Sequence, residues 1–242
     1  MLLGGHRGNP FEHPENTLAS FASAIELGVD VIECDVHLTT DGRLAVIHDH
    51  TLDRTTTSSG PVGRRTMAEL AALDAGNGEK VPELSEVLEL ARGRVGVAIE
   101  IKSTPVRYPG LEERLVAEVR DQRMVDDCAV ICFDHRVIRR VRDLEDGLVV
   151  GALVAGRPLL LAQLLAYARA EVYSPHWSFA DVDTVADTHE CGAVVGVWTV
   201  DDERTLNDVL AAGVDAVYSN RPGVIAGLLE ARGAARPGRN PA

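Results

Sequence analysis

The feature that most constrains this chain is an alternation of two kinds of segment. Short apolar runs rich in β-branched residues predict strands, and they alternate with stretches that carry apolar residues at helical spacing, such as residues 18–25 and 84–91. The alternation is typical of an α/β protein with a parallel sheet and helices packed outside it. The predicted strands are Leu2–His6, Asp30–Val36, Leu44–His48, Val95–Ile101, Cys128–Phe133, Leu148–Val154, Glu171–Ser174, Ala193–Val200 and Asp215–Ser219.

One of these runs, Leu44–His48, differs from the others because only "TTDG" separates it from the preceding strand-like segment. A parallel crossover needs about a dozen residues or more, so a turn at Asp41–Gly42 predicts an antiparallel hairpin instead. Without this arm, eight parallel strands remain. The sequence therefore predicts a (β/α)8 TIM barrel with a β-hairpin and a short insertion after the second barrel strand.

The domain organisation follows from the same pattern. We expect a single barrel domain over residues 1–232, interrupted by a small polar insertion at residues 49–81 on the side of the barrel that carries active sites. Residues 233–242 contain Gly, Pro and Arg without an apolar period, which predicts a disordered C-terminal tail.

The net charge of −13 argues against a nucleic-acid partner or an anionic membrane surface, because both need a basic footprint. No apolar run approaches the roughly 20 residues of a membrane span, so we expect no stable membrane association. The N-terminus lacks the pattern of a signal peptide. The four cysteines form no CxxC pair, and we expect reduced, buried thiols in a cytoplasmic protein.

Charged residues stand in the hairpin "DVIECDVHLTTDGRLAVIHDH" where a buried strand is predicted. Glu33, Asp35 and His37 share one face of the strand by alternation, and a two-residue turn would place His48 opposite Asp35. Two buried carboxylates at i and i+2 repel each other unless a cation lies between them, and a hard divalent ion such as Mg²⁺ or Ca²⁺ would satisfy both. The alternative is an edge strand whose acids face solvent.

Further polar residues stand at the ends of neighbouring predicted strands. Glu100 and Lys102 share a face at the end of one strand, and His6 and Arg7 end the first. Active groups of a barrel lie at the carboxyl ends of its strands, so Glu100 is a third candidate metal ligand. Two histidines beside a metal suit acid and base roles, and Arg7 and Lys102 suit a phosphate. Each of these residues also has a purely structural explanation.

Two weaker candidates complete the predicted site. Glu15 in "HPENT" could pair with Arg7, while Asn16 or Thr17 suits the N-cap of the first helix. Trp198 near the end of the strand "GVWTV" could line the pocket, although core packing explains it equally well.

Several motifs together resemble the glycerophosphodiester phosphodiesterase family, within the phospholipase C-like phosphodiesterase barrels. They occur in the family's order across nearly the whole predicted barrel. The matching stretches are "HRG" at 6–8, "PENT" at 14–17, "GVDVIECDVHLTTDGRLAVIHD" at 28–49, "LDRTT" at 52–56, "EIK" at 100–102 and "VWTVDD" at 197–202.

The resemblance implies a role for most of the candidate residues. It implies that His6 and His48 are the acid/base pair, that one divalent cation is bound, and that Arg7 and Lys102 contact the phosphate. The implied metal ligands are Glu33, Asp35 and Glu100. One departure concerns Asn220 in "SNRP", where the family commonly has an acid.

The expected activity is hydrolysis of a glycerophosphodiester to sn-glycerol 3-phosphate and an alcohol. The nucleophile is either water or the 2-hydroxyl of glycerol. Alternatives are a lysophospholipase D-type activity on single-chain lipids, which needs an apolar groove at the barrel mouth, and a non-catalytic phosphodiester-binding or structural barrel.

Overall fold

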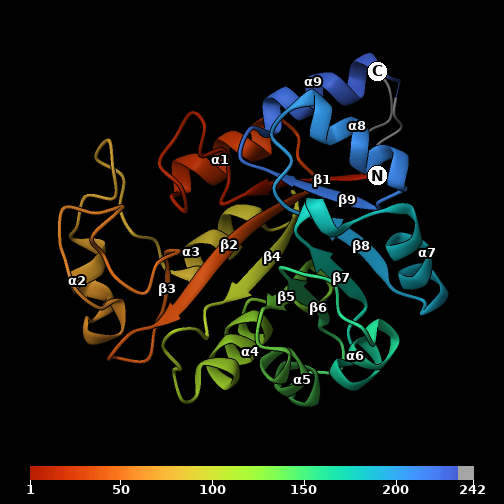
Figure 1. Ribbon diagram of the computed structural model, residues 1–242. Helices are drawn as coiled ribbons and strands as arrows, with labels where there is room; N and C mark the ends of the chain where they lie inside the picture. The colour runs from red at the N-terminus through yellow and green to blue at the C-terminus, as the bar shows by residue number, and fades with distance from the viewer. Residues whose placement is uncertain (234–242) are drawn as a thin grey trace.

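The computed structural model describes residues 1–233 and has a closed barrel of eight parallel strands, so the predicted (β/α)8 architecture is confirmed (Figure 1). The first strand pairs with both its neighbour and the last strand, which closes the ring. All but the first residue of the predicted tail, residues 233–242, lies outside the described residues. The barrel strands are β1 (Leu2–His6), β2 (Val31–Leu38), β4 (Gly96–Ile101), β5 (Cys128–Cys132), β6 (Val149–Val154), β7 (Val172–Pro175), β8 (Val194–Val197) and β9 (Ala216–Ser219).

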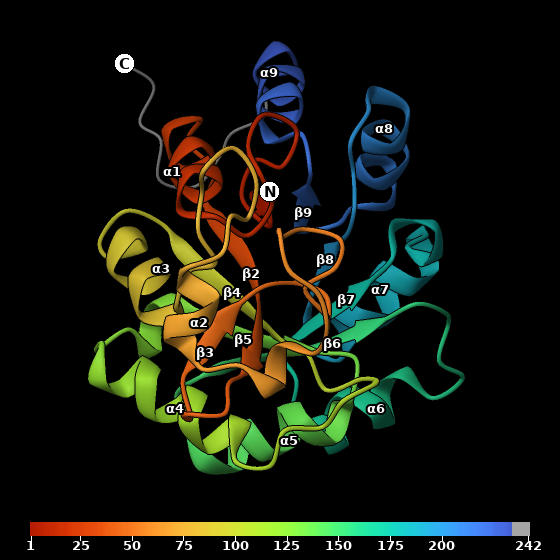
Figure 2. The ribbon, with the colours of Figure 1, turned by 90° about the vertical axis from the view of Figure 1, so that its left-hand side faces the viewer.

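Helices surround the barrel on its outer side (Figures 1 and 2). Their ends follow from local sequence: the Thr17 hydroxyl accepts from Ser20 N at the start of the first helix, and Gly213 ends the eighth with φ +86°. The helices are α1 (Leu18–Glu26), α2 (Met67–Ala71), α3 (Leu84–Ala91), α4 (Leu111–Asp121), α5 (His135–Leu144), α6 (Leu161–Ala168), α7 (Val182–Glu190), α8 (Glu203–Ala212) and α9 (Pro222–Ala231), with short 3-10 turns at Val62–Arg64, Val125–Asp127 and Trp177–Phe179.

Strict alternation along β2 and β4 decides which side chains enter the barrel. On β2, Ile32, Cys34 and Val36 pack in the main core against the helices, so the residues between them face inward. The same alternation on β4 directs Val97, Ile99 and Ile101 outward. The inward positions of these two strands carry Glu33, Asp35, His37, Ala98 and Glu100.

The hairpin is present, but its predicted register is wrong by one residue. The added strand β3 (Leu44–Val46) pairs antiparallel with β2, with His37 opposite Ala45. The turn has three residues rather than two: Thr39 N donates to Arg43 O at 2.9 Å, and Gly42 takes the left-handed φ of +75°. Asp35 therefore lies opposite Ile47, not His48, and His48 reaches the site because the chain leaves the strand after Val46.

Residues 49–81 form a lobe beside the barrel, on the side of β3 (Figure 2). The lobe has a small apolar core of its own, which Ala45 and Ile47 of the hairpin extend. The contributing residues of the lobe are Leu52, Val62, Met67, Leu70, Ala75 and Val81. Packing on the hairpin fixes the lobe next to the carboxyl ends of β1 and β2.

All four cysteines are free thiols, but the expectation that all are buried is wrong for Cys191, which is exposed after α7. The chain ends that helix at Cys191 and turns at Gly192 toward β8, so this position faces outward. Within residues 1–233 the structure has no helix that is long and apolar enough to cross a membrane.

Candidate active site

The strand registers bring the predicted acids together at the mouth of the barrel. His6 of β1 lies beside Glu33 of β2, and Asp35 of β2 lies beside Glu100 of β4. All three carboxylates are buried, and one oxygen from each lies within 4.8 Å of one from each of the others. The sequence predicted this cluster from the alternation of Glu33 and Asp35 along one strand and from the place of Glu100 near the end of the next.

A tight turn after β1 fixes the first side of the cluster. Arg7 and Gly8 both adopt left-handed backbone conformations, with φ of +56° and +88°. The turn directs Arg7 N at Glu33 Oε2, to which it donates at 2.9 Å. A Cβ atom at Gly8 would come within 2.4 Å of the Ser20 hydroxyl oxygen, so the turn needs glycine both for its conformation and for space.

Two cations and one amide hold Asp35. Lys102 Nζ lies 2.9 Å from Asp35 Oδ1 and 2.6 Å from Glu100 Oε1, and Arg7 Nε lies 3.4 Å from Asp35 Oδ2. The Asn16 side chain donates to Asp35 Oδ2 at 2.7 Å and accepts from Asp35 N at 3.2 Å. Thr17, rather than Asn16, is therefore the N-cap of α1.

The three carboxyl groups differ in their pKa values. Burial, together with Asp35 and Glu100, raises the pKa of Glu33 well above its usual value. Burial and the charge of Asp35 raise the pKa of Glu100 to about 7. Burial also opposes ionisation of Asp35, but Lys102 and Arg7 outweigh it and lower its pKa.

The residues present fit a hard divalent cation. Buried carboxylate oxygens are the donors that Mg²⁺ and Ca²⁺ prefer, and like charges this close repel unless a cation lies between them. Asp35 Oδ1 is buried and has no well-oriented hydrogen bond, although Lys102 Nζ is near. The oxygen is thus available to a further cation. Glu33, Asp35 and Glu100 are the residues that could hold it.

His6 is held by a neutral partner. Its Nδ1 lies 2.7 Å from Asn220 Oδ1, and the Asn220 amide nitrogen donates to Asp201 Oδ2 at 2.8 Å. Because a carboxylate only accepts, Asp201 fixes the amide so that its oxygen faces His6. The histidine then carries its proton on Nδ1, and its Nε2 lies 4.0 Å from Glu33 Oε2. Burial and Arg7 lower the pKa of His6 to about 4.

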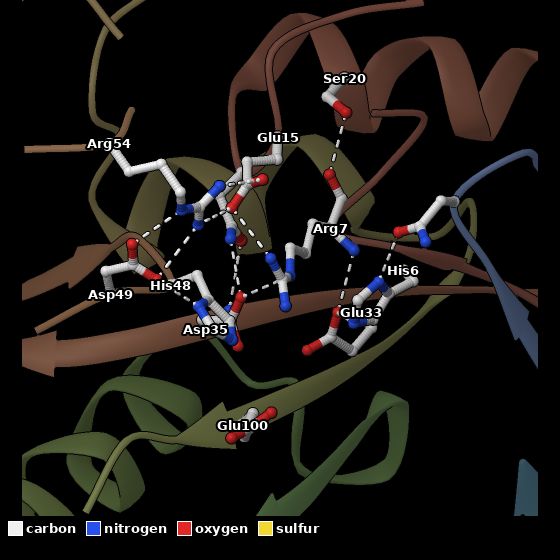
Figure 3. A network of polar contacts seen from close by, with 12 residues as sticks. His6, Arg7, Glu15, Ser20, Glu33, Asp35, His48, Asp49, Arg54 and Glu100 are labelled. Atoms are coloured by element: carbon white, nitrogen blue, oxygen red, sulfur yellow. Dashed lines mark hydrogen bonds and ion pairs between the residues drawn. The ribbon is translucent and has the colours of Figure 1, made fainter. Parts of the chain in front are cut away.

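His48 is held by a carboxylate instead. Its Nδ1 lies 2.7 Å from Asp49 Oδ1, and Arg54 Nε donates to Asp49 Oδ2 at 2.7 Å. Arg54 also contacts Glu15 Oε1 at 2.7 Å, and Glu15 in turn accepts from Arg7 at 3.0 Å. Burial lowers the pKa of His48, while Asp35 and Asp49 oppose that shift. Figure 3 shows His6 and His48 at opposite ends of the Glu33–Asp35 pair.

His37 does not join the cluster. It is buried under the hairpin, where its Nε2 lies 3.1 Å from the His48 carbonyl and its Nδ1 lies 2.9 Å from the Tyr108 hydroxyl. Burial lowers its pKa to about 4. The side chain supports the backbone at His48 from behind the site.

Four residues of the network were not predicted as part of the site, although one of them, Asn16, was a candidate N-cap. Their contacts join segments that lie 19 to 39 residues apart, or adjoin a histidine directly, and local patterns do not reveal them. The quoted motifs "PENT", "HD", "LDRTT" and "VWTVDD" contain them and were the available signal. The residues are Asn16, Asp49, Arg54 and Asp201.

A cavity of about 620 Å³ opens over the acidic cluster. One wall is polar and includes His6, Arg7 and Lys102, and the wall of β5, β6 and the end of β8 is mainly apolar. Trp198 lies in the apolar wall, where its ring packs edge-on against Phe133 and its Nε1 donates to Ser174 O at 3.0 Å. The cavity thus lies over the candidate metal-binding carboxylates and is lined by both candidate imidazoles together with Arg7 and Lys102.

Comparison with known proteins assigns this barrel to a family. Residues 6–224 match the model of the glycerophosphoryl diester phosphodiesterase family. A glycerophosphodiester phosphodiesterase of Caldanaerobacter subterraneus is 36% identical over 96% of this chain and 99% of its own length. One from Bacillus altitudinis is 34% identical over 90% of this chain and 93% of its own.

Solved structures agree with the sequence relatives. A phosphodiesterase of Oleispira antarctica, in complex with the product sn-glycerol-3-phosphate, superposes with a TM-score of 0.86 at 29% identity and covers 95% of this chain and 97% of its own. A glycerophosphodiester phosphodiesterase of Agrobacterium tumefaciens gives 0.82 at 30% identity, over 94% and 99%. The chain belongs to the glycerophosphoryl diester phosphodiesterase family, as the motifs predicted.

Proposed function

We propose that this protein hydrolyses glycerophosphodiesters to sn-glycerol 3-phosphate and an alcohol, with one divalent cation and two catalytic histidines. The observation that carries the proposal is the meeting of three buried carboxylates, two cations and two imidazoles at one cavity. The product complex of the Oleispira antarctica relative supports the choice of substrate. The net charge of −13 makes nucleic acid an unsuitable substrate.

His6 suits the role of general base. Its Nδ1 proton is held by the Asn220 amide oxygen, so the Nε2 lone pair faces the cavity. An amide does not stabilise an imidazolium as a carboxylate does, and burial keeps this ring neutral. Nε2 would accept the proton of the nucleophile, which is either water or the glycerol 2-hydroxyl.

His48 suits the role of general acid. The Asp49 carboxylate faces its Nδ1 and stabilises the protonated ring, and Arg54 keeps Asp49 in place. The ring would donate its Nε2 proton to the oxygen of the departing alcohol. The two imidazoles lie at opposite ends of the acid pair in Figure 3, as displacement at phosphorus requires.

The phosphate is bound by the chain's own cations. Arg7 and Lys102 line the cavity beside Asp35 and would contact phosphoryl oxygens. A divalent cation held by Glu33, Asp35 and Glu100, Mg²⁺ or Ca²⁺, would stabilise the negative charge that develops on those oxygens.

The direct test measures release of glycerol 3-phosphate from glycerophosphodiesters with added Mg²⁺, Ca²⁺ or EDTA. Metal-dependent release supports the proposal, and full activity in EDTA would remove the metal from it. A 2-deoxy substrate decides the nucleophile: normal turnover excludes attack by the 2-hydroxyl.

The roles of the histidines have a separate test. His48→Ala should lose about 10²- to 10⁴-fold with a poor leaving alcohol and recover with a nitrophenyl ester, which needs no general acid. His6→Ala should remain slow on both esters. Recovery of His6→Ala on the nitrophenyl ester, with His48→Ala slow on both, would reverse the assignment.

A second candidate is lysophospholipase D-type hydrolysis of single-chain lipids. The apolar wall of the cavity supports it, since Phe11 and Phe133 line the cavity and remain exposed at its mouth. An acyl chain on glycerol could lie along this wall. Turnover of lysophosphatidylcholine comparable to that of glycerophosphocholine would favour this candidate.

The proposed location is the cytoplasm, and the proposed role is in glycerol and lipid metabolism. The four free thiols support a reducing compartment. Recovery of the protein from the extracellular medium with oxidised cysteines would contradict this location.

A further inference from the structure

A second cavity adjoins the one that holds the proposed catalytic residues. It has a volume of about 330 Å³ and shares His48, Glu100, Lys102 and Phe133 with the larger cavity. The two cavities are therefore adjacent at Glu100 and Lys102, near which the proposed function places the phosphate. A phosphodiester has two ester arms, and two adjacent cavities beside the phosphate give each arm a place.

The histidines indicate which arm enters which cavity. His6 lines only the larger cavity, whereas His48 lines both. Under the proposed function, on which this inference rests, His48 donates a proton to the departing oxygen. The departing alcohol then lies on the side of His48, and glycerol 3-phosphate stays on the side of His6.

The lining of the smaller cavity differs from the apolar wall of the larger one. His50 and Thr104 line it with an imidazole and a hydroxyl, and neither side chain has a hydrogen-bond partner within residues 1–233. These groups can bond to hydroxyl groups of a ligand. The hydroxyl of Ser103, also in the lining, already contacts Cys132 Sγ at 3.4 Å.

The same cavity has no free anion to attract a cationic headgroup. Asp49 is its one further carboxylate among the residues described, and both of its oxygens are engaged by His48 and Arg54. Glu100 is paired with Lys102, whose ammonium group faces the same space. A quaternary ammonium would meet the Lys102 ammonium group there, and both carboxylates of the lining are already paired.

We propose that the cavity lined by His50, Ser103 and Thr104 binds the departing alcohol and favours one with further hydroxyl groups over one with a quaternary ammonium. Glycerol and inositol represent the favoured class, and choline represents the other. Its volume lies at the small end of the roughly 300–1,000 Å³ typical of small-molecule sites, as suits a compact polyol.

The test compares four esters that share the glycerophosphate half and differ in the alcohol: glycerol, inositol, ethanolamine and choline. Release of glycerol 3-phosphate by the full chain in saturating Mg²⁺ gives kcat/KM for each. We expect values for the glycerol and inositol esters about tenfold above that for the choline ester, the effect of one or two hydrogen bonds.

Two variants locate the preference in this cavity. Thr104→Val keeps the size of the side chain and removes its hydroxyl, so kcat/KM should fall about fivefold for the polyol esters and less than twofold for the choline ester. His50→Leu should act in the same direction. Thr57→Val is the matched control, because Thr57 is an exposed residue of the lobe that lines neither cavity.

Each outcome bears on the proposal. Equal kcat/KM for choline and polyol esters in the unmodified protein, or an equal loss on all esters in both variants, overturns the subsite and leaves the proposed function standing. Failure to release glycerol 3-phosphate from any ester overturns the proposed function and the subsite together.

Discussion

Two sectors of the same barrel mouth have opposite chemistry. The sector of β1, β2 and β4 presents the acidic cluster with Arg7 and Lys102, and the sector of β5 to β8 presents mainly apolar side chains such as Ile131, Leu153 and Trp198. Both sectors are built from parallel strands that end at the same edge. The difference lies in the inward positions near the strand ends, which carry titratable groups in the first sector and mostly apolar groups in the second, where Ser174 of β7 is a polar exception.

The comparison shows that the charged groups come together because they lie on neighbouring strands of the sheet. Registers place His6 beside Glu33 and Asp35 beside Glu100, so three neighbouring strands are sufficient for the ion cluster. The apolar sector lines the other side of the cavity, and a less polar surrounding strengthens charge interactions. Variants in the two sectors should therefore have effects of very different size.

The largest effect is expected for Asp35→Asn in the charged sector. Loss of the central carboxylate removes the partner that Lys102 and Arg7 share and a candidate metal ligand, so kcat/KM should fall by about 10³-fold or more. Steady-state kinetics measure it, with Asp183→Asn on the outer helix α7 as the matched control. A fall in kcat/KM of less than tenfold would contradict the distinction between the two sectors.

Metal affinity in the same sector should depend on pH. The pKa of Glu100 is raised to about 7, so this group is protonated below that pH and must lose its proton when a cation binds. Affinity should therefore fall about tenfold between pH 8 and pH 6. Calorimetry in two buffers of different ionisation enthalpy measures both the affinity and the proton release, and Glu100→Gln should remove this part of the dependence.

A smaller effect is expected where the charged sector ends, at Asn220. Asn220→Asp would place a carboxylate on Nδ1 of His6 and raise the pKa of that ring, which is now about 4. A general base must be unprotonated, so the acidic limb of the kcat/KM profile should move to higher pH, by about one unit. An unchanged limb would contradict the role of His6, and Asn77→Asp in the lobe is the control.

The smallest effect is expected in the apolar sector. Trp198→Ala should raise KM about fivefold and change kcat less than twofold, because the ring lines the cavity without touching the acidic cluster. Tyr167→Ala, at an exposed position of α6, is the control, and thermal unfolding shows whether the barrel is intact. A loss in kcat as large as that of Asp35→Asn would erase the distinction between the sectors.

Most of the fold was predictable because strand period and crossover length are local properties of the sequence. The nine strands and the antiparallel arm follow from them. Alternation predicted that Glu33 and Asp35 share one face, and the position near a strand end made Glu100 the third candidate. The hairpin register was not predictable in this way. Asp41–Gly42 fits a two-residue turn as well as the three-residue turn that forms, and the choice depends on how Gly42 and Thr39 bond.

The contacts that orient the histidines lay beyond sequence reasoning for another reason. Asn16 reaches Asp35 from the loop before α1, and Arg54 reaches Glu15 from the lobe, across 19 and 39 residues of chain. No periodicity connects such positions. Asn220 was noticed as a departure from the family pattern, but its bond to Asp201 becomes visible only when β8 and β9 lie side by side.

Closure of the barrel links the first strand to a residue that follows the last one. His6 ends the first strand of the barrel, and the amide that contacts it, Asn220, follows 214 positions later. A chain that stops before β9 still contains Glu33, Asp35 and Glu100, but its His6 has no partner on Nδ1. Under the proposed function, the orientation of His6 therefore depends on the last strand, so activity would report that the barrel has closed.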